Sequence, residues 1–127
     1  MVIAFMVTQM SSARRGIATD EMKQVAKDED VTLDWLIPKV AKGSIIIPSN
    51  NVRPQKIHNV GIGNGMKTKV NVNIGTSTLN VNVEEEVEKA KVAVKYHADT
   101  IMDLSDGGDV GTIRRTLLDA APITFGT

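Results

Sequence analysis

The chain has 127 residues, enough for one domain with a moderate core, and its 15 Lys and Arg balance its 15 Asp and Glu. This neutral charge indicates no basic surface for nucleic acid, and one Trp, one Tyr and two Phe are too few for a base-stacking platform. Cysteine is absent, which excludes disulfides, thiolate zinc sites and cysteine-ligated iron–sulfur clusters within the chain.

The first residues, MVIAFMV, are apolar but no basic segment precedes them, so we expect no signal peptide. No apolar run approaches the ~20 residues that are needed to cross a bilayer. We therefore expect a cytoplasmic protein without a membrane partner.

Residues 1–66 predict a small N-terminal α+β domain of helices and a β-hairpin. Residues 8–18 show no clear apolar period and predict an extended or irregular segment. A short helix near 20–28 follows, opened by a Thr-Asp-Glu sequence that suits a helix N-terminus. The next helix contains Pro38, which should kink it or split it into two turns. SIIIP (44–48) then predicts a short strand.

The segment GIGNG (61–65) has two interpretations. Asn64-Gly65 is a strong hairpin signal, and strand-like runs flank it on both sides. The glycines also resemble a phosphate-binding loop, but the third glycine of G-x-G-x-x-G is absent and a strand follows instead of a helix. We therefore predict a hairpin turn at this segment.

The second half of the chain predicts alternating strands and helices. Strand 67–74 precedes a helix that Asn82 caps, and we expect the acidic run Glu84–Glu86 to be the solvated start of that helix. Strand 99–105, a helix that begins at Asp109 and a short third strand complete the series. The order β-α-β-α-β is typical of a parallel sheet.

Residues 67–127 are too few to complete such a sheet. A parallel sheet is normally covered on both faces, and an eight-stranded barrel needs ~250 residues. This region would hold the first two βα units and the start of a third strand. We therefore expect an α/β sheet that is incomplete in this chain.

Two asparagines alternate with apolar residues in the strand KVNVNI. In a barrel, Val70, Val72 and Ile74 would face the helices, and Asn71 and Asn73 would point into the lumen. Asn73 would lie near the carboxyl end of its strand, where barrel enzymes build their active sites. Its amide both donates and accepts, which suits a polar heterocycle or a sugar. The alternative is that the two asparagines satisfy one another in the barrel core.

The strand 99–105 repeats this geometry. Thr100, Met102 and Leu104 share one of its faces. Taken alone, Met102 is more simply interpreted as a core residue than as a ligand contact.

Four charged or titratable residues have roles that the sequence leaves open. His58 and His97 are the only histidines and share no metal-ligand spacing, so we expect no metal site and a surface or interface position for each. Arg14 and Arg15 have two interpretations, contact with a substrate phosphate from a partner chain or, more simply, surface ion pairs.

Four ordered stretches match motifs of one known family: TQMSSARRGIATDEM, NVNIGTS, EEEVEKAKVAVKYHADTIMDLSDGGD and IRRTLLDAAPITFGT. With them the chain resembles the N-terminal portion of the phosphomethylpyrimidine synthase family, the radical enzymes of thiamine biosynthesis. The family's patterns are close to TQM-x-x-ARRG, N-x-NIG-x-S and ADT-x-MDLS-x-G, and the likeness runs from Thr8 to the last residue. The chain departs from the family at Val72, where alanine is usual, and at His97, where glycine is common.

The resemblance implies a radical S-adenosylmethionine carbon–carbon lyase that converts aminoimidazole ribonucleotide into hydroxymethylpyrimidine phosphate. It also implies a small N-terminal domain, an (α/β)8 barrel, a cluster-binding C-terminal segment and a homodimer. By motif, Asn73 and Met102 match the family's substrate-binding asparagine and methionine, and we expect Asn71 to help position Asn73.

The same resemblance limits what this chain does alone. The family uses a [4Fe-4S] cluster, S-adenosylmethionine and zinc, but its cluster cysteines, zinc histidines and remaining site residues have no counterpart in this sequence. We therefore expect no bound cofactor, no catalytic residue and no activity in this chain by itself. The alternative is a stand-alone, non-catalytic binding or dimerisation module that hides its open sheet edge by oligomerisation.

Overall fold

The computed structural model describes residues 7–50, 52–53 and 57–127. The segment 1–6, where we expect no signal peptide, therefore lies outside the described residues. The described residues form two compact units, which are taken separately: those within Met1–Pro48 and Asn59–Lys67, and those within Ser49–His58 and Thr68–Thr127.

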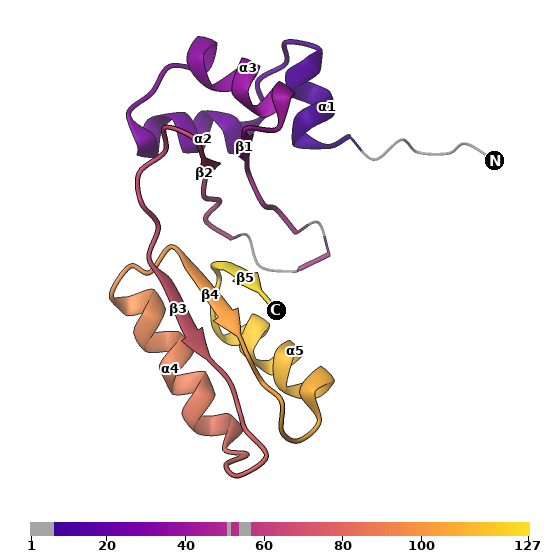
Figure 1. The fold of residues 1–127 in the computed structure, drawn as a ribbon, viewed down its shortest axis with the longest axis vertical. Coiled ribbons are helices and arrows are strands. Elements are labelled where there is room, and N and C mark those ends of the chain that lie inside the picture. The colour runs from indigo at the N-terminus through magenta and orange to yellow at the C-terminus, as the bar shows by residue number, and fades with distance from the viewer. Residues whose placement is uncertain (1–6, 51, 54–56) are drawn as a thin grey trace, which may run out of the picture. The chain divides into compact units, whose positions relative to one another are not determined.

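The first unit combines helices with a small antiparallel sheet (Figure 1). Its described elements are α1 (Gln9–Arg14), α2 (Asp20–Glu29), α3 (Leu33–Lys42), β1 (Ile45–Ile46) and β2 (Ile62–Gly63).

A threonine caps each helix of the first unit. Thr8, Thr19 and Thr32 each accept a hydrogen bond from a backbone N–H three residues later. The prediction of an irregular segment over 8–18 was wrong, because α1 lies there. Thr8 and Ser11 cap that helix reciprocally, with N–H to Oγ distances of 2.9 and 3.1 Å. This capping pair indicates a helix start, but the helix has no periodic pattern of apolar residues by which it could be predicted.

The helix α3 continues through Pro38, so the expected split into two turns is not seen. The missing N–H of Pro38 leaves the carbonyl of Asp34 without its helical donor. Both residues are exposed, and water can therefore satisfy that carbonyl. Gly43 ends the helix in the left-handed conformation, with φ of 76°.

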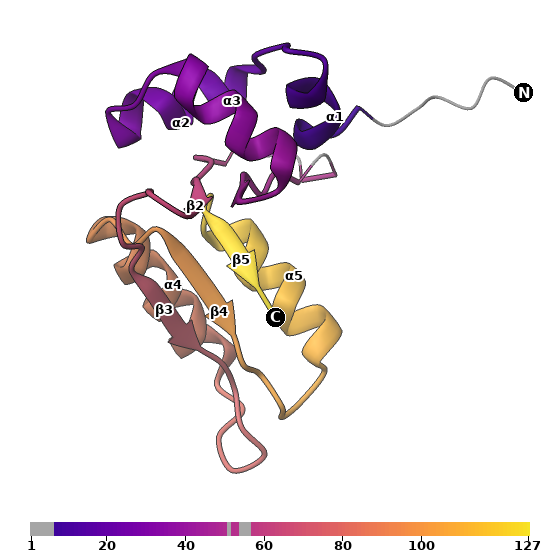
Figure 2. The ribbon, with the colours of Figure 1, turned by 45° about the horizontal axis from the view of Figure 1, so that its top comes forward.

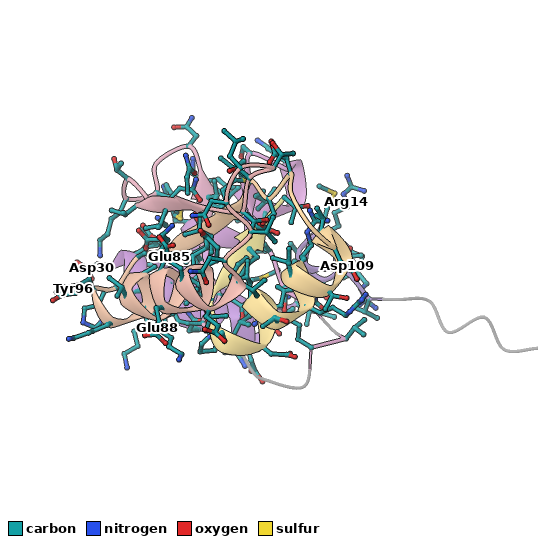
Figure 3. The ribbon with its side chains drawn as sticks, turned by 90° about the horizontal axis from the view of Figure 1, so that it is seen from below. Arg14, Asp30, Glu85, Glu88, Tyr96 and Asp109 are labelled. Atoms are coloured by element: carbon teal, nitrogen blue, oxygen red, sulfur yellow. The ribbon has the colours of Figure 1, made fainter. Side chains whose placement is uncertain are left out.

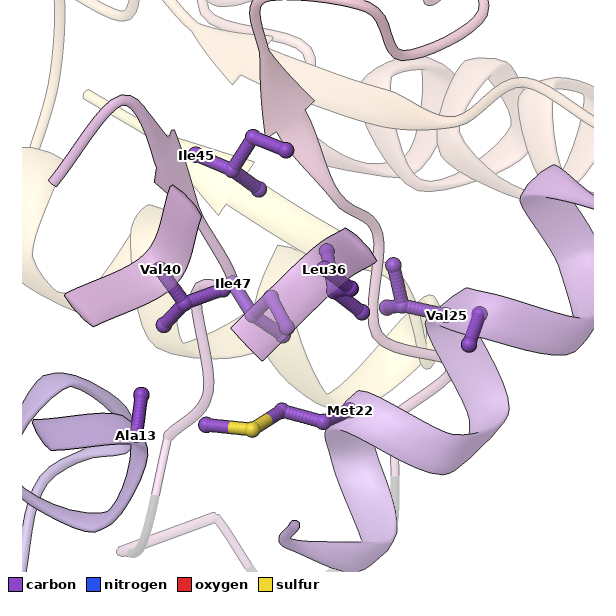
Figure 4. Packing of buried hydrophobic residues seen from close by; sticks show 8 residues of the cluster. Ala13, Met22, Val25, Leu36, Val40, Ile45 and Ile47 are labelled. Atoms are coloured by element: carbon purple, nitrogen blue, oxygen red, sulfur yellow. The ribbon is translucent and has the colours of Figure 1, made fainter. Parts of the chain in front are cut away.

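The core of the first unit lies between its helices and β1 (Figure 4). Removing these apolar side chains from water is the main force that holds so small a unit together. The buried residues are Ala13, Met22, Val25, Ala26, Leu36, Val40, Ile45 and Ile47.

The predicted hairpin around Asn64 and Gly65 was wrong. The two residues do form a turn, in which the Met66 N–H donates to the carbonyl of Gly63 at 3.2 Å. However, β2 pairs with the earlier strand β1, and no described strand after the turn pairs with it. A Cβ on Gly63 would lie 2.2 Å from the Ser44 carbonyl oxygen, so glycine permits this close approach.

The second unit is a parallel α/β unit, and its element order confirms the predicted β-α-β-α-β series. Its strands form one parallel sheet in the order β3-β4-β5. The elements are β3 (Asn71–Ile74), α4 (Val83–Lys95), β4 (Thr100–Asp103), α5 (Val110–Ala120) and β5 (Thr124–Gly126).

Both helices of the second unit cover the same face of its sheet, and Figure 2 shows them together behind the strands. Their shared core joins Ile74 and Ile101 from the strands with Ala90 from α4 and Leu117 from α5. Side chains alternate between the faces of a strand. The opposite face of the sheet therefore carries the residues between these apolar ones.

Arg53 binds the C-terminal end of α5, a contact that sequence analysis did not identify. Its guanidinium donates to the carbonyls of Leu118, of Ala121 at 2.8 Å and of Ile123 at 2.9 Å. The last carbonyls of a helix lack intrahelical donors, and this side chain supplies them. Burial lowers the pKa of Arg53 below its ordinary value.

Candidate functional site

The two predicted site residues lie side by side on β3 and β4. The parallel register pairs Asn73 with Met102, and Asn71 with Thr100. Paired residues share a face of the sheet, so all four side chains lie on the face opposite α4 and α5. Asn73 is exposed and Met102 is partly buried.

The next strand contributes a glycine to the same row. Met102 pairs with Gly126 of β5, and a Cβ on Gly126 would lie 2.9 Å from Met102 Cε and 3.1 Å from its Sδ. The thioether therefore occupies the space that the glycine leaves. Sequence analysis missed Gly126, because only the register between strands of different βα units places it beside Met102.

Hydrogen bonds connect the polar side chains of this face. Thr100 Oγ1 donates to Asn71 Oδ1 at 2.7 Å, and Asn71 Nδ2 donates to Asn73 Oδ1 at 3.1 Å. The two asparagines thus do bond to one another. Among the described residues, however, none accepts a hydrogen bond from Asn73 Nδ2. The N–H groups of this amide can therefore donate to a ligand.

A cavity of about 310 Å³ opens beside Asn73 at the carboxyl end of β3. Its polar wall combines an amide, a carboxylate and an ammonium group. Its lining residues are Asn73, Ile74, Gly75, Glu86, Lys89 and Leu104.

Glu86 is buried, which contradicts the prediction that Glu84–Glu86 is simply a solvated helix start. The Gly75 N–H donates to Glu86 Oε2 at 2.7 Å, and Lys89 Nζ donates to Glu86 Oε1 at 2.8 Å. Lys89 also contacts Glu85 at 3.0 Å. The hydrogen bonds that Lys89 donates to Glu86 and Glu85 raise the pKa of Lys89. The hydrogen bond from Lys89 also lowers the pKa of Glu85.

The loops that follow β3 and β4 are joined to each other. Thr76 Oγ1 donates to the Gly107 carbonyl at 2.7 Å, and the Asp106 N–H donates to the Thr76 carbonyl at 3.0 Å. The Thr76 N–H also donates to Ser105 Oγ at 3.1 Å. A Cβ on Gly107 would lie 2.3 Å from the backbone of Ser77. These contacts fix the backbone at the carboxyl ends of both strands.

Asp103 ends β4 on the helix-covered face. Its carboxylate accepts hydrogen bonds from Ser105 Oγ at 2.6 Å and from Arg114 Nε at 3.3 Å. The group is buried, and these partners offset the cost of removing its charge from water. It holds the strand end in place and does not face the row that contains Asn73.

The two arginines with open roles bond to backbone carbonyls in the first unit. Arg14 Nε donates to the Ala41 carbonyl at 3.2 Å, and Arg15 Nε donates to the Ser11 carbonyl at 3.3 Å. Both arginines are exposed. The structure therefore gives each of them a local contact near a helix end.

A second, largely apolar cavity of about 410 Å³ lies along the open edge of β3. Val70 and Val72 line it from the strand, and Val92, Tyr96 and His97 line it from α4 and the turn that follows. Figure 3 shows Tyr96 at the outer surface, and its side chain is 73% exposed.

The histidines are exposed, as expected, and His97 adopts a left-handed backbone conformation with φ of 60°. Among the described residues, no three His, Cys, Asp or Glu side chains are grouped so that they could hold a metal ion. No helix in the described ranges is both long and apolar enough to cross a membrane.

Comparison with known proteins confirms the resemblance to one family. The family model described as the radical SAM ThiC family matches residues 8–127. Phosphomethylpyrimidine synthase 1 of Methanothermobacter thermautotrophicus is 50% identical over 121 residues, which are 95% of this chain and 28% of that protein. A Pyrococcus furiosus synthase and a Thermus thermophilus synthase are 52% and 48% identical with the same coverage. The chain thus spans about 28% of the length of these relatives.

Proposed function

This chain belongs to the radical SAM ThiC family, and from that membership we propose that it forms part of a phosphomethylpyrimidine synthase. The complete enzyme would convert aminoimidazole ribonucleotide into hydroxymethylpyrimidine phosphate by S-adenosylmethionine radical chemistry. The chain would contribute part of the substrate site, at the carboxyl ends of β3 and β4.

The observation that carries this proposal is the register that pairs Asn73 with Met102. An amide supplies directional hydrogen bonds to a polar ligand, and a thioether packs against a flat ring without demanding one geometry. A cavity of about 310 Å³ beside Asn73 provides space for a ligand at the carboxyl end of β3, and Met102 is not among the residues that line it. Asn73 and Met102 are the substrate-binding residues that the family motifs indicate.

The arrangement of the second unit supports the proposal that residues 67–127 begin a (β/α)8 barrel, after an N-terminal domain over 1–66. In such a barrel the helices form one outer layer, and the other face of the sheet becomes the lumen. Here the strands are parallel, both helices cover one face, and Asn73 lies on the other face. Active sites of this fold lie at the carboxyl ends of the strands.

The residues of this chain do not fit the cofactors of the family chemistry. A [4Fe-4S] cluster needs cysteine thiolates, and the sequence contains no cysteine. A zinc site needs three or four grouped ligands, which the described residues do not provide. We therefore assign no step of the radical reaction to this chain, and we expect it to be inactive alone.

The alternative of a stand-alone, non-catalytic module is not favoured, because the curated relatives are named as synthases. A homodimer, a cytoplasmic location and the absence of a nucleic-acid partner remain predictions.

The proposal is tested by titrating aminoimidazole ribonucleotide into the chain, with binding followed by calorimetry. We expect Asn73→Ala to weaken binding about tenfold, because it removes a hydrogen bond to the ligand. Asn80→Ala is the matched control, since Asn80 is exposed in the same unit and does not line the cavity. Equal affinity of wild type and Asn73→Ala, or no binding by wild type, would contradict a substrate site in this chain.

A further inference from the structure

Hydrogen bonds link three side chains on the face of the sheet opposite α4 and α5, which we call the open face. Each side chain in this series donates to the next one. The series begins at Thr100 Oγ1, passes through the amide of Asn71 and ends at Asn73 Oδ1, over distances of 2.7 and 3.1 Å. A carboxamide has a donor end and an acceptor end. The direction of the first hydrogen bond therefore determines which end of each following side-chain amide, oxygen or nitrogen, faces its neighbour.

The first bond decides which end of Asn73 is exposed to a ligand. Thr100 donates to Asn71 Oδ1, so Asn71 turns its Nδ2 toward Asn73 and occupies the Asn73 oxygen. If Thr100 accepted from Asn71 instead, both amides would be reversed and Asn73 would present its oxygen. The hydroxyl of Thr100, as the first donor, therefore sets how the amides of Asn71 and Asn73 are oriented.

Thr100 is well suited to hold that direction. It is buried, its β-branched side chain is stiff, and its backbone N–H donates to the Val70 carbonyl at 3.2 Å. Its neighbour across the register is Thr124, whose buried Oγ1 has no hydrogen-bond partner among the described residues. The Thr100 hydroxyl proton is therefore not shared with Thr124 and remains directed at Asn71.

We infer that Thr100, acting through Asn71, turns the Asn73 amide so that its N–H groups, and not its carbonyl, contact the ligand. This inference rests on the proposed binding role of Asn73. It identifies the ligand group that Asn73 recognises as a hydrogen-bond acceptor. In aminoimidazole ribonucleotide the acceptors are the unprotonated ring nitrogen and the ribose and phosphate oxygens, whereas the exocyclic amine donates.

Two matched threonine variants test this positioning role without a ligand. Asparagine is labelled with ¹⁵N, and the side-chain amide resonances are recorded for wild type, Thr100→Val and Thr124→Val. We expect Thr100→Val to shift the resonances of Asn71 and Asn73, because it removes the donor that fixes both amides. Thr124→Val should leave them unchanged, because the hydroxyl that it removes bonds to none of the described residues. Thr100→Ser, which restores a hydroxyl, should return the wild-type resonances.

Binding of aminoimidazole ribonucleotide to the same variants tests whether the orientation of the Asn73 amide affects ligand affinity. We expect Thr100→Val to weaken binding about threefold to tenfold, and Thr124→Val to leave it unchanged. Unaltered Asn71 and Asn73 resonances in a folded Thr100→Val would overturn the inference, even if wild type binds. If the resonances shift as expected but wild type does not bind, the positioning role stands and the proposed substrate site fails.

Discussion

Glu86 connects the first turns of α4 to the end of β3. Its side chain is 4% exposed, and its two carboxylate oxygens accept hydrogen bonds from the Gly75 N–H and from Lys89. A buried carboxylate is tolerated only when such partners replace water. Because Glu86 and Lys89 also line the cavity beside Asn73, this contact shapes the candidate site.

Two replacements of Glu86 distinguish its hydrogen bond with the Gly75 N–H from its ion pair with Lys89. We expect Glu86→Ala to lower the free energy of unfolding by about 2 kcal/mol, because the Gly75 N–H loses its partner away from water. Glu86→Gln retains an oxygen for that N–H and should cost less, losing chiefly the interaction with Lys89. Urea denaturation of the three proteins measures the difference. Equal destabilisation by both variants would show that Gly75 does not depend on this oxygen.

The residues of the candidate site differ in how far the sequence reveals them. Asn73 and Met102 stand in strands with period-two alternation, so the face that they share could be predicted, and their role in substrate binding stays a prediction. The burial of Glu86 could not be predicted, because an acidic run at a helix start looks the same whether or not a neighbouring loop presents an N–H. Gly126 was missed since its partner lies in another βα unit.

At the scale of helices and strands, local signals predicted more than distant ones. The caps Thr19, Asn82 and Asp109 act within three residues, and each accepts the expected backbone hydrogen bond. The turn at Asn64-Gly65 also forms, but its sequence does not specify which strand pairs with β2. The contact of Arg53 with α5 spans more than sixty residues of sequence, and no local pattern reports it.

The cap of α5 should make stability depend on pH. Hydrogen bonds from the hydroxyl and backbone N–H of Thr112, at 2.7 and 3.1 Å, lower the pKa of Asp109. A carboxyl group whose pKa is lower in the folded chain stabilises the fold above its unfolded pKa. That stabilisation is lost as the pH falls through the folded pKa.

We expect wild type to lose stability relative to Asp109→Asn below about pH 4, where the unfolded carboxyl begins to bind protons. Asparagine retains the cap but does not titrate in this range. Urea midpoints of both proteins between neutral pH and about pH 2.5 measure the effect. Asp106→Asn is the control, because Asp106 is exposed and its side chain accepts no hydrogen bond within the described chain. A constant difference between wild type and Asp109→Asn across this range would refute the prediction.

At the scale of the whole molecule, one edge of the parallel sheet, along β3, pairs with no described strand. The carbonyls of Val70 and Ile74 accept hydrogen bonds from the β4 side. Alternate residues of a parallel strand point their backbone groups the other way, so those of Asn71 and Asn73 face the open edge. An apolar cavity of about 410 Å³ lies along this edge. Such an edge tends to pair with another chain.

We therefore expect this chain to self-associate through the β3 edge and the neighbouring surface of α4. Light scattering after size-exclusion chromatography should give a mass above that of the monomer. Val92→Lys should shift the equilibrium toward monomer, because Val92 is 51% exposed and lines the apolar cavity. Leu79→Lys is the matched control, since Leu79 is 98% exposed and lies outside that cavity. A folded wild-type monomer at all accessible concentrations would contradict the predicted homo-oligomer.

The joined loops after β3 and β4 limit how this site can change during evolution. Thr76 bonds to Gly107 and Asp106, and the Gly107 backbone leaves no room for a Cβ beside Ser77. An insertion in either loop would therefore displace the other, and both would have to change together. Descendants with a new ligand preference would more readily arise by exchanging single side chains on the open face than by lengthening these loops.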